Sequence, residues 1–173
     1  RSAVERGPAS LNDLARATVA LRKYEFSMAG ITLEEHYTDD LPLVLVNREE
    51  VQQVLLNLIL NAEHAMKAQG RPGRLRVRTA AGPEGVAIEV EDNGPGVPVN
   101  VAQRIFEPFF STKGVGEGTG LGLSIALGIA QAHGGSLSLA DAAEGTGACF
   151  RLLLPAAVGE DGKAVGAAGV AAR

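Results

Sequence analysis

The fold is decided by residues 86–96, which read VAIEVEDNGPG. Val86, Ile88 and Val90 alternate with small or acidic residues, which predicts a strand with one buried face. Asp92 has the same parity as these three residues, so its carboxylate is expected to point toward the buried side. A buried carboxylate needs a partner, and the exocyclic amine of a purine would satisfy it. A plain β-turn is the alternative explanation, since Asp, Asn, Gly and Pro are common turn residues.

The flanking sequence predicts a sheet with separate helices. An alternating strand near 74–78 and a turn at 82–85 make a hairpin with the strand described above. The remaining periodicities predict helices at 11–29, 48–68 and 121–133, strands near 31–33, 43–46, 136–140 and 148–154, and a short helical piece near 100–106. These elements indicate the α+β class: a two-layer α/β sandwich with a mixed, mostly antiparallel sheet and three main helices on one face.

The first two predicted helices have defined ends. Leu14, Leu21 and Met28 recur at seven-residue spacing, which predicts one continuous buried stripe. Gly30 is expected to end this helix. Asn47 is expected to cap the second helix.

Three polar residues interrupt the apolar pattern of the second helix. Asn57, Asn61 and His64 are separated by four and three residues, so they lie on one helical face. Asparagine is a poor helix former, and its neutral amide oxygen suits a hard cation such as Mg²⁺ that is held mainly by substrate phosphates. A solvated helix face is the alternative interpretation.

A glycine-rich run precedes the third helix. Residues 114–124 read GVGEGTGLGLS. Alternate glycines before a helix bring amide N–H groups and the positive helix end toward an anion. The run has neither the spacing of a P-loop nor that of a dinucleotide fingerprint. A flexible linker is the alternative, but the flanks are apolar and periodic, and a long irregular stretch at 93–119 fits a loop that closes over a ligand.

Composition excludes several classes of protein. The chain has 173 residues, a net charge of −4 and one cysteine, Cys149, so it is no disulfide scaffold. The mild acidity and the absence of a basic cluster argue against nucleic acid as a partner. The charge-free run 118–140 is interrupted by Gly134 and Gly135, so we do not expect a membrane span. A cytoplasmic domain without membrane contact is expected, whether or not the parent protein is membrane-anchored.

Taken together, the motifs resemble the catalytic ATP-binding domain of bacterial sensor histidine kinases, in the superfamily of gyrase, Hsp90 and MutL. The boxes are most similar to those of the nitrogen-regulation (NtrB-like) subclass. Residues 57–66 resemble the N box, 92–96 the G1 box, 104–113 the F box and 118–124 the G2 box. The resemblance implies a Bergerat-type fold over 9–155, preceded by a linker at 1–8. The Ala/Gly-rich residues 156–173 are expected to be a tail or linker.

The resemblance also implies roles for individual residues. Asn61 would coordinate Mg²⁺ with Asn57 nearby, and His64 would contact phosphate where many relatives carry lysine. Asp92 would read the adenine amino group. The other implied ATP-binding residues are Gly94, Gly96, Phe110, Lys113, Thr119, Gly120, Leu121, Gly122 and Leu123. The resemblance also implies a mobile lid over the ATP, anchored by the aromatic residues Phe106, Phe109 and Phe110.

The implied activity is transfer of the γ-phosphate of Mg-ATP to a histidine on a separate dimerisation domain, with a response regulator as indirect partner. None of His36, His64 and His133 has the sequence context of that phosphoacceptor, so the chain is expected to be the catalytic half alone. Asn57 occupies the position of the water-activating glutamate of gyrase and Hsp90. Because an amide cannot take a proton, hydrolysis should be slow.

Two other functions remain open. One is an anti-sigma-type serine kinase of the same superfamily, and the other is a degenerate module that only docks partners. Ala148 stands where the family often has a base-supporting threonine, which leaves room for the second.

Overall fold

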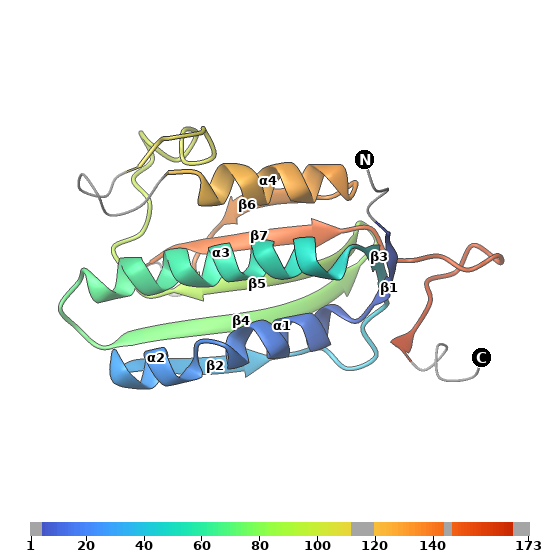
Figure 1. Ribbon diagram of the computed structural model, residues 1–173, viewed down its shortest axis with the longest axis horizontal. Helices are drawn as coiled ribbons and strands as arrows, with labels where there is room; N and C mark the ends of the chain where they lie inside the picture. The colour runs from blue at the N-terminus through green and yellow to red at the C-terminus, as the bar shows by residue number, and fades with distance from the viewer. Residues whose placement is uncertain (1–4, 112–119, 144–146, 168–173) are drawn as a thin grey trace.

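The computed structural model describes residues 5–111, 120–143 and 147–167, which fold into two layers (Figure 1). One layer is a five-stranded sheet in the order β2-β4-β5-β7-β6, and the helices cover one of its faces. The strands are β1 (Gly7–Ala9), β2 (Ile31–His36), β3 (Val44–Val46), β4 (Gly73–Gly82), β5 (Gly85–Asp92), β6 (Ser136–Ala140) and β7 (Cys149–Leu154). The helices are α1 (Leu11–Ala20), α2 (Lys23–Met28), α3 (Arg48–Lys67) and α4 (Gly122–Ala132). β2 is parallel to β4 and the other neighbours are antiparallel, so the predicted α+β sandwich is confirmed.

The central hairpin forms where it was predicted. β4 and β5 pair from Leu75 opposite Asp92 to Gly82 opposite Gly85. Gly85 has φ +134°, and a Cβ there would lie 2.3 Å from the carbonyl oxygen of Leu154, so a side chain cannot be accommodated at this turn. The hairpin therefore places Asp92 at the end of the sheet away from the turn.

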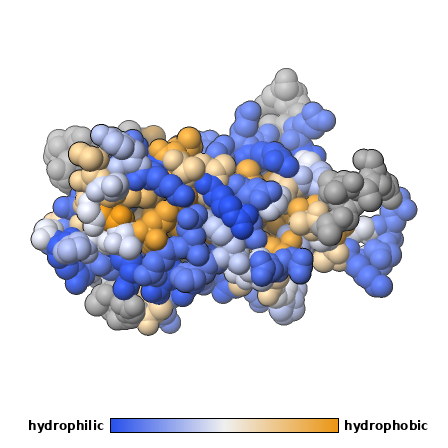
Figure 2. All heavy atoms as spheres, turned by 90° about the horizontal axis from the view of Figure 1, so that it is seen from below, coloured by the Kyte–Doolittle hydropathy of each residue, from blue (hydrophilic) through white to orange (hydrophobic). Residues whose placement is uncertain are grey.

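The single helix predicted at 11–29 is wrong, because the chain forms two helices there. Leu21 and Met28 are 59% and 71% exposed, so the seven-residue spacing does not trace a buried stripe. Figure 2 views this side of the molecule and shows apolar surface among mainly hydrophilic side chains. The break lies at Arg22, whose guanidinium donates to both carboxylate oxygens of Glu63 on α3.

α3 is capped as predicted and is tied to α4. The side-chain oxygen of Asn47 accepts a hydrogen bond from the Glu50 N–H at 2.8 Å. The Asn47 N–H donates to Nε2 of the buried His133 at 3.1 Å, and Nδ1 of that ring lies 2.8 Å from the Ile129 carbonyl oxygen. His133 therefore joins the start of α3 to the end of α4.

The hydrophobic core lies between the helices and the sheet. Its largest fully buried apolar side chains are Phe26, Leu11, Leu55, Leu58, Ile59, Leu75, Ile88, Leu152 and Leu154. Within the ranges that the structure describes, none of the helices has the length and apolar character needed to cross a membrane.

The helical piece predicted near 100–106 is wrong, because this segment is a series of turns. The N–H groups of Val101 and Ala102 both donate to the carbonyl oxygen of Pro98, and the Arg104 N–H donates to Val101. Bonds of the i to i+3 type dominate, so the repeating i to i+4 pattern of an α-helix is not established.

The segments expected to be linkers make backbone hydrogen bonds in the structure. Leu43 donates its N–H to the carbonyl oxygen of Val165 and accepts a hydrogen bond from the Ala157 N–H, both at 2.7 Å. β1 begins at Gly7, inside the segment expected to be an N-terminal linker. Figure 1 places the segment 156–167 at the β1-β3 end of the molecule, away from the loops that follow β5.

Candidate functional site

Asp92 is a buried carboxylate at the end of β5. The residue is 2% exposed, which confirms the orientation expected from its parity. Its Oδ1 accepts hydrogen bonds from the N–H groups of Gly94 at 2.8 Å and Ala148 at 3.3 Å. Burial raises the pKa of the carboxyl, the two backbone hydrogen bonds act against this rise, and the nearby Glu91 adds to it. In the part of the chain that the structure describes, no cationic side chain pairs with Asp92, so it remains available to an amine.

The glycines after Asp92 are required by close contacts. A Cβ on Gly94 would lie 2.9 Å from Oδ1 of Asp92 and 3.2 Å from Cβ of Ala65 on α3. Gly96 has φ +80°, and its Cβ would lie 2.8 Å from the carbonyl oxygen of Gly147. The turn is therefore pressed between α3 and the segment that leads into β7, which a plain surface turn would not require.

The polar face of α3 lies beside this turn. Asn57 and Asn61 are half-buried and His64 is exposed, in keeping with a face directed away from the core. The Asn57 amide donates a hydrogen bond to the carbonyl oxygen of Gly122 at 3.1 Å, so this side chain joins α3 to the first residue of α4. The structure therefore brings the first three motifs predicted from the sequence next to one another.

Asn61 is the second amide on this face of α3. Its side chain has no hydrogen-bond partner among the described residues. It lies one helical turn after Asn57, which contacts α4, and one turn before Ala65, which contacts Gly94. A neutral oxygen in this place fits a cation that takes most of its ligands from water and phosphate.

Aromatic side chains hold the root of the segment between β5 and α4. The rings of Phe106 and Phe150 meet edge to face at 6.1 Å, and the Arg104 guanidinium lies over the Phe110 ring at 4.6 Å. Both Phe106 and Phe110 pack against the core. Phe109 does not, because its side chain is 76% exposed, so the anchoring role expected for it is wrong.

Phe109 has a different place in the structure. Its φ is +66°, an unusual value for a residue with a side chain, and its N–H donates to the carbonyl oxygen of Gly120 at 3.0 Å. Gly120 has φ +69°, and a Cβ there would lie 2.7 Å from the Phe109 carbonyl carbon. This backbone contact between Phe109 and Gly120, called the clasp below, joins the residues on either side of the segment between them.

α4 begins directly after the glycine-rich run. Leu121 is the N-cap residue and makes no side-chain capping bond, and Gly122 is the first helical residue. Such a helix start presents amide N–H groups and positive potential to an anion. Leu123 is half-buried and packs against the core. Lys113 and Thr119, which the sequence also proposes as ATP contacts, lie outside the described residues.

α3 also carries a buried carboxylate with two cationic partners, which was not predicted from the sequence. Glu63 is 1% exposed and bonds to Arg22 and to Lys67, with Lys67 Nζ at 2.7 Å. Burial would raise the pKa of this carboxyl, but the hydrogen bonds from both cations outweigh it and hold the pKa below its usual value. The burial of Glu63, though not its pairing with Arg22, could be predicted from the sequence, because Glu63 follows Ile59 by four residues and so occurs on the buried face of α3.

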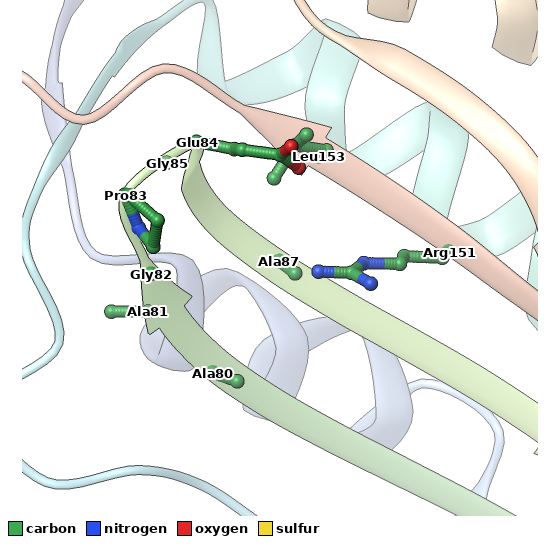
Figure 3. Close-up of a pocket in the computed structure, with 9 residues that line it drawn as sticks. All are labelled: Ala80, Ala81, Gly82, Pro83, Glu84, Gly85, Ala87, Arg151 and Leu153. Carbon is green, nitrogen blue, oxygen red and sulfur yellow. The ribbon is translucent and has the colours of Figure 1, made fainter.

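A small pocket elsewhere does not belong to this site. It measures about 130 Å³ and lies at the turn of the β4-β5 hairpin, next to Arg151 and Leu153 (Figure 3). Asp92 stands at the other end of β5, about 23 Å away at 3.3 Å per residue.

Comparison with known proteins agrees with this site. Residues 46–158 match the model of the family "Histidine kinase-, DNA gyrase B-, and HSP90-like ATPase". The signal transduction histidine-protein kinase AtoS of Escherichia coli (strain K12) is 37% identical over 147 residues, which are 84% of this chain and 23% of AtoS. The sensory histidine kinase/phosphatase NtrB of Rhizobium meliloti (strain 1021) is 36% identical over 170 residues, which are 90% of this chain and 43% of NtrB. The chain thus spans less than half the length of these relatives.

Solved structures give the same result. A nucleotide-free catalytic domain of histidine kinase ThkA superposes with a TM-score of 0.76 at 30% identity, covering 87% of this chain and 97% of that domain. ThkA in complex with the response regulator protein TrrA superposes with a TM-score of 0.71 at 27% identity, covering 87% of this chain and 41% of the ThkA chain.

Proposed function

The chain belongs to the family of histidine kinase-, DNA gyrase B- and HSP90-like ATPases, and we propose that it binds Mg-ATP and transfers the γ-phosphate to a histidine on a separate dimerisation domain. The AtoS and NtrB relatives, which are sensor histidine kinases, support this reading over a serine kinase or a docking module. The proposed catalytic unit spans 9–155 and acts in the cytoplasm, with a response regulator downstream.

The buried Asp92 carboxylate is the observation that carries the proposal. Oδ1 accepts from two backbone N–H groups, whereas Oδ2 makes no hydrogen bond to the residues that the structure describes, so it can accept one from the adenine amino group. A hydrogen bond to a charged acceptor contributes roughly 1.5–3 kcal/mol. Gly94 and Gly96 leave only backbone beside Asp92, where a flat ring can approach closely.

The triphosphate is proposed to extend from Asp92 along α3 toward the start of α4. Asn61 would hold Mg²⁺, which neutralises charge on the phosphates when bound. Asn57 and His64 lie on the same helical face, and His64 would donate to a phosphate oxygen. The N–H groups of Gly122 and Leu123, in the first turn of α4, would face the phosphate chain, together with Lys113 and Thr119.

Asn57 favours phosphoryl transfer by a kinase over hydrolysis of ATP. Its amide cannot accept a proton from water, and in the structure it donates to the Gly122 carbonyl. Phosphoryl transfer to a histidine needs positioning and charge neutralisation rather than a base on this chain. The γ-phosphate is therefore expected to persist until an acceptor histidine arrives.

Nucleotide binding by variants tests the site. Fluorescent ATP is titrated into the wild type and into Asp92→Asn and Asn61→Ala, each with and without Mg²⁺. We expect Asp92→Asn to weaken binding at least tenfold in both conditions, because a base contact is lost. Asn61→Ala should remove most of the gain that Mg²⁺ gives the wild type. Unchanged affinity in both variants would refute the site.

A further inference from the structure

The side chain of Asn93 ends the pairing of β4 with β5. The last pair of that ladder is Leu75 opposite Asp92, so Arg74 stands opposite Asn93. In a continued ladder the Arg74 N–H would donate to the backbone of β5. It donates instead to Asn93 Oδ1 at 2.7 Å. The side chain thus replaces a backbone partner, and β5 leaves the sheet directly after the Asp92 carboxylate.

The other groups of Asn93 bind the connection between α3 and β4. Nδ2 donates to the Pro72 carbonyl oxygen at 3.1 Å, and the Asn93 carbonyl oxygen accepts from Arg71 Nη2 at 2.7 Å. Arg71 Nε in turn donates to Gln69 Oε1 at 2.9 Å. Both the side chain and the backbone carbonyl of Asn93 are therefore held by the connection that joins these two elements.

The next N–H along the chain holds the Asp92 carboxylate. The Asn93 carbonyl and the Gly94 N–H belong to one planar trans peptide unit, in which the two groups point in opposite directions. Because Arg71 fixes the carbonyl, the N–H is fixed as well. It donates to Asp92 Oδ1 at 2.8 Å. The orientation of the carboxylate therefore depends on the contacts of Asn93.

We infer that Asn93 is a positioning residue for base recognition: through the Asn93–Gly94 peptide it holds the donor that fixes Oδ1 of Asp92 and leaves Oδ2 for the adenine amino group. This inference rests on the proposed function, since it assigns the control of base selectivity at that same site. The path from Asn93 to the carboxylate passes through directly bonded neighbours.

Asn12 provides a matched control. Its Nδ2 donates to the Thr38 carbonyl oxygen at 2.9 Å, and its Oδ1 accepts from Thr79 Oγ1 at 2.7 Å. Thr79 lies opposite Ile88, four residues before Asp92 on β5. Asn93→Ala and Asn12→Ala each delete one amide that both donates and accepts a hydrogen bond. A general loss of stability should affect both variants, whereas a loss of base selectivity should affect Asn93→Ala alone.

The Gly94 amide proton reports on the carboxylate without any nucleotide. A hydrogen bond to an ionised carboxylate shifts such a proton downfield in the NMR spectrum and slows its exchange with water. In Asn93→Ala we expect the Gly94 signal to move upfield and to exchange about tenfold faster than in the wild type. In Asn12→Ala it should stay in place. An unchanged Gly94 signal in Asn93→Ala would overturn the inference.

The functional measurement is the preference for ADP over inosine diphosphate, which lacks the adenine amino group. Both nucleotides compete with a fluorescent ADP analogue for the wild-type chain and for each variant. We expect Asn93→Ala to lower the preference about fivefold to tenfold through ADP binding, because a misplaced Asp92 loses its hydrogen bond to the base. Asn12→Ala should stay within about twofold of the wild type.

Arg71→Ala tests the same peptide from its other side. Arg71 is exposed, so this variant serves even if Asn93→Ala does not fold. Loss of the guanidinium frees the Asn93 carbonyl and should lower the ADP preference about twofold to fourfold, with the same direction of shift for the Gly94 amide. A wild-type preference in the folded variants would overturn the role of Asn93. A wild type that binds neither nucleotide, or binds both equally, overturns the proposed adenine site itself, and the Gly94 signal distinguishes that outcome from a failure of the Asn93 contacts.

Discussion

Asp92 is suited to binding at the expense of stability. Burial raises the pKa of its carboxyl above the value of 3.8 expected in an unfolded chain. The folded protein therefore binds this proton more tightly than the unfolded chain does. Ionised Asp92 lowers the free energy of unfolding, and this loss develops as the pH rises from the unfolded pKa through the folded pKa. An amine donor from a ligand would stabilise the ionised form.

Asp92→Asn should separate the two properties. An asparagine oxygen can still accept from Gly94 and Ala148, but no charge is buried. We expect the ligand-free variant to melt at or above the wild-type temperature at pH 7, while ATP binding falls at least tenfold. The difference in melting temperature should shrink as the pH falls through the raised pKa of folded Asp92, where the wild-type carboxyl gains its proton. A variant that melts lower at pH 7 and keeps its ATP affinity would contradict this account.

At the level of elements, the ion pair between α2 and α3 explains where the N-terminal helix breaks. Arg22 lies between the two helices α1 and α2. Its guanidinium donates to Glu63, which is buried on α3. Because the pKa of Glu63 is lowered, its contribution to stability is present above the unfolded pKa and is lost as the pH falls through the folded value.

Arg22→Ala should therefore destabilise the fold strongly at neutral pH. Glu63 would be left with Lys67 alone, and breaking a buried pair of this kind lowers the free energy of unfolding by about 3 kcal/mol. Chemical denaturation of the wild type and the variant measures the difference. The double variant Arg22→Ala, Glu63→Met is the control and should recover part of the loss, since no carboxylate is left buried. A decrease of less than about 0.5 kcal/mol in the free energy of unfolding would show that the Arg22–Glu63 pair contributes no more than an exposed salt bridge.

The clasp between Phe109 and Gly120 gives another expectation for an element, the segment before α4. Gly120→Ala puts a Cβ 2.7 Å from the Phe109 backbone at φ +69°, so the two ends of the segment must separate. Nucleotide affinity is expected to fall at least fivefold, with the far-ultraviolet circular dichroism unchanged. Gly128→Ala is the matched control, because a Cβ at that position of α4 meets nothing within 4 Å. Equal affinity in both variants would refute the role of the clasp.

Sequence patterns predicted what depends on local chemistry. The Asn47 cap, the β4-β5 hairpin and the inward parity of Asp92 each follow from neighbours a few residues away, and the structure confirms them. The break at Arg22 and the clasp at Phe109 depend on residues 41 and 11 positions distant. Such long-range pairs leave no periodicity in the sequence, so they could not be predicted from it.

On the scale of the whole molecule, the candidate site lies at the opposite end of the domain from β1 and the segment 156–167. The β1-β3 sheet and the segment 156–167 lie at one end, and the loops after α3 and β5 lie at the other (Figure 1). This separation suits a catalytic unit that presents its nucleotide to a partner domain.

Phosphotransfer tests the central claim most directly. The chain is incubated with γ-labelled ATP, Mg²⁺ and the histidine-bearing dimerisation domain of the same kinase, and the labelled protein is then treated with acid or base. The account predicts label on the dimerisation domain that is lost in acid and kept in base, no label with Asp92→Asn, and slow release of phosphate without the acceptor. Acid-stable label, or no transfer from a wild-type chain that binds Mg-ATP, would contradict it.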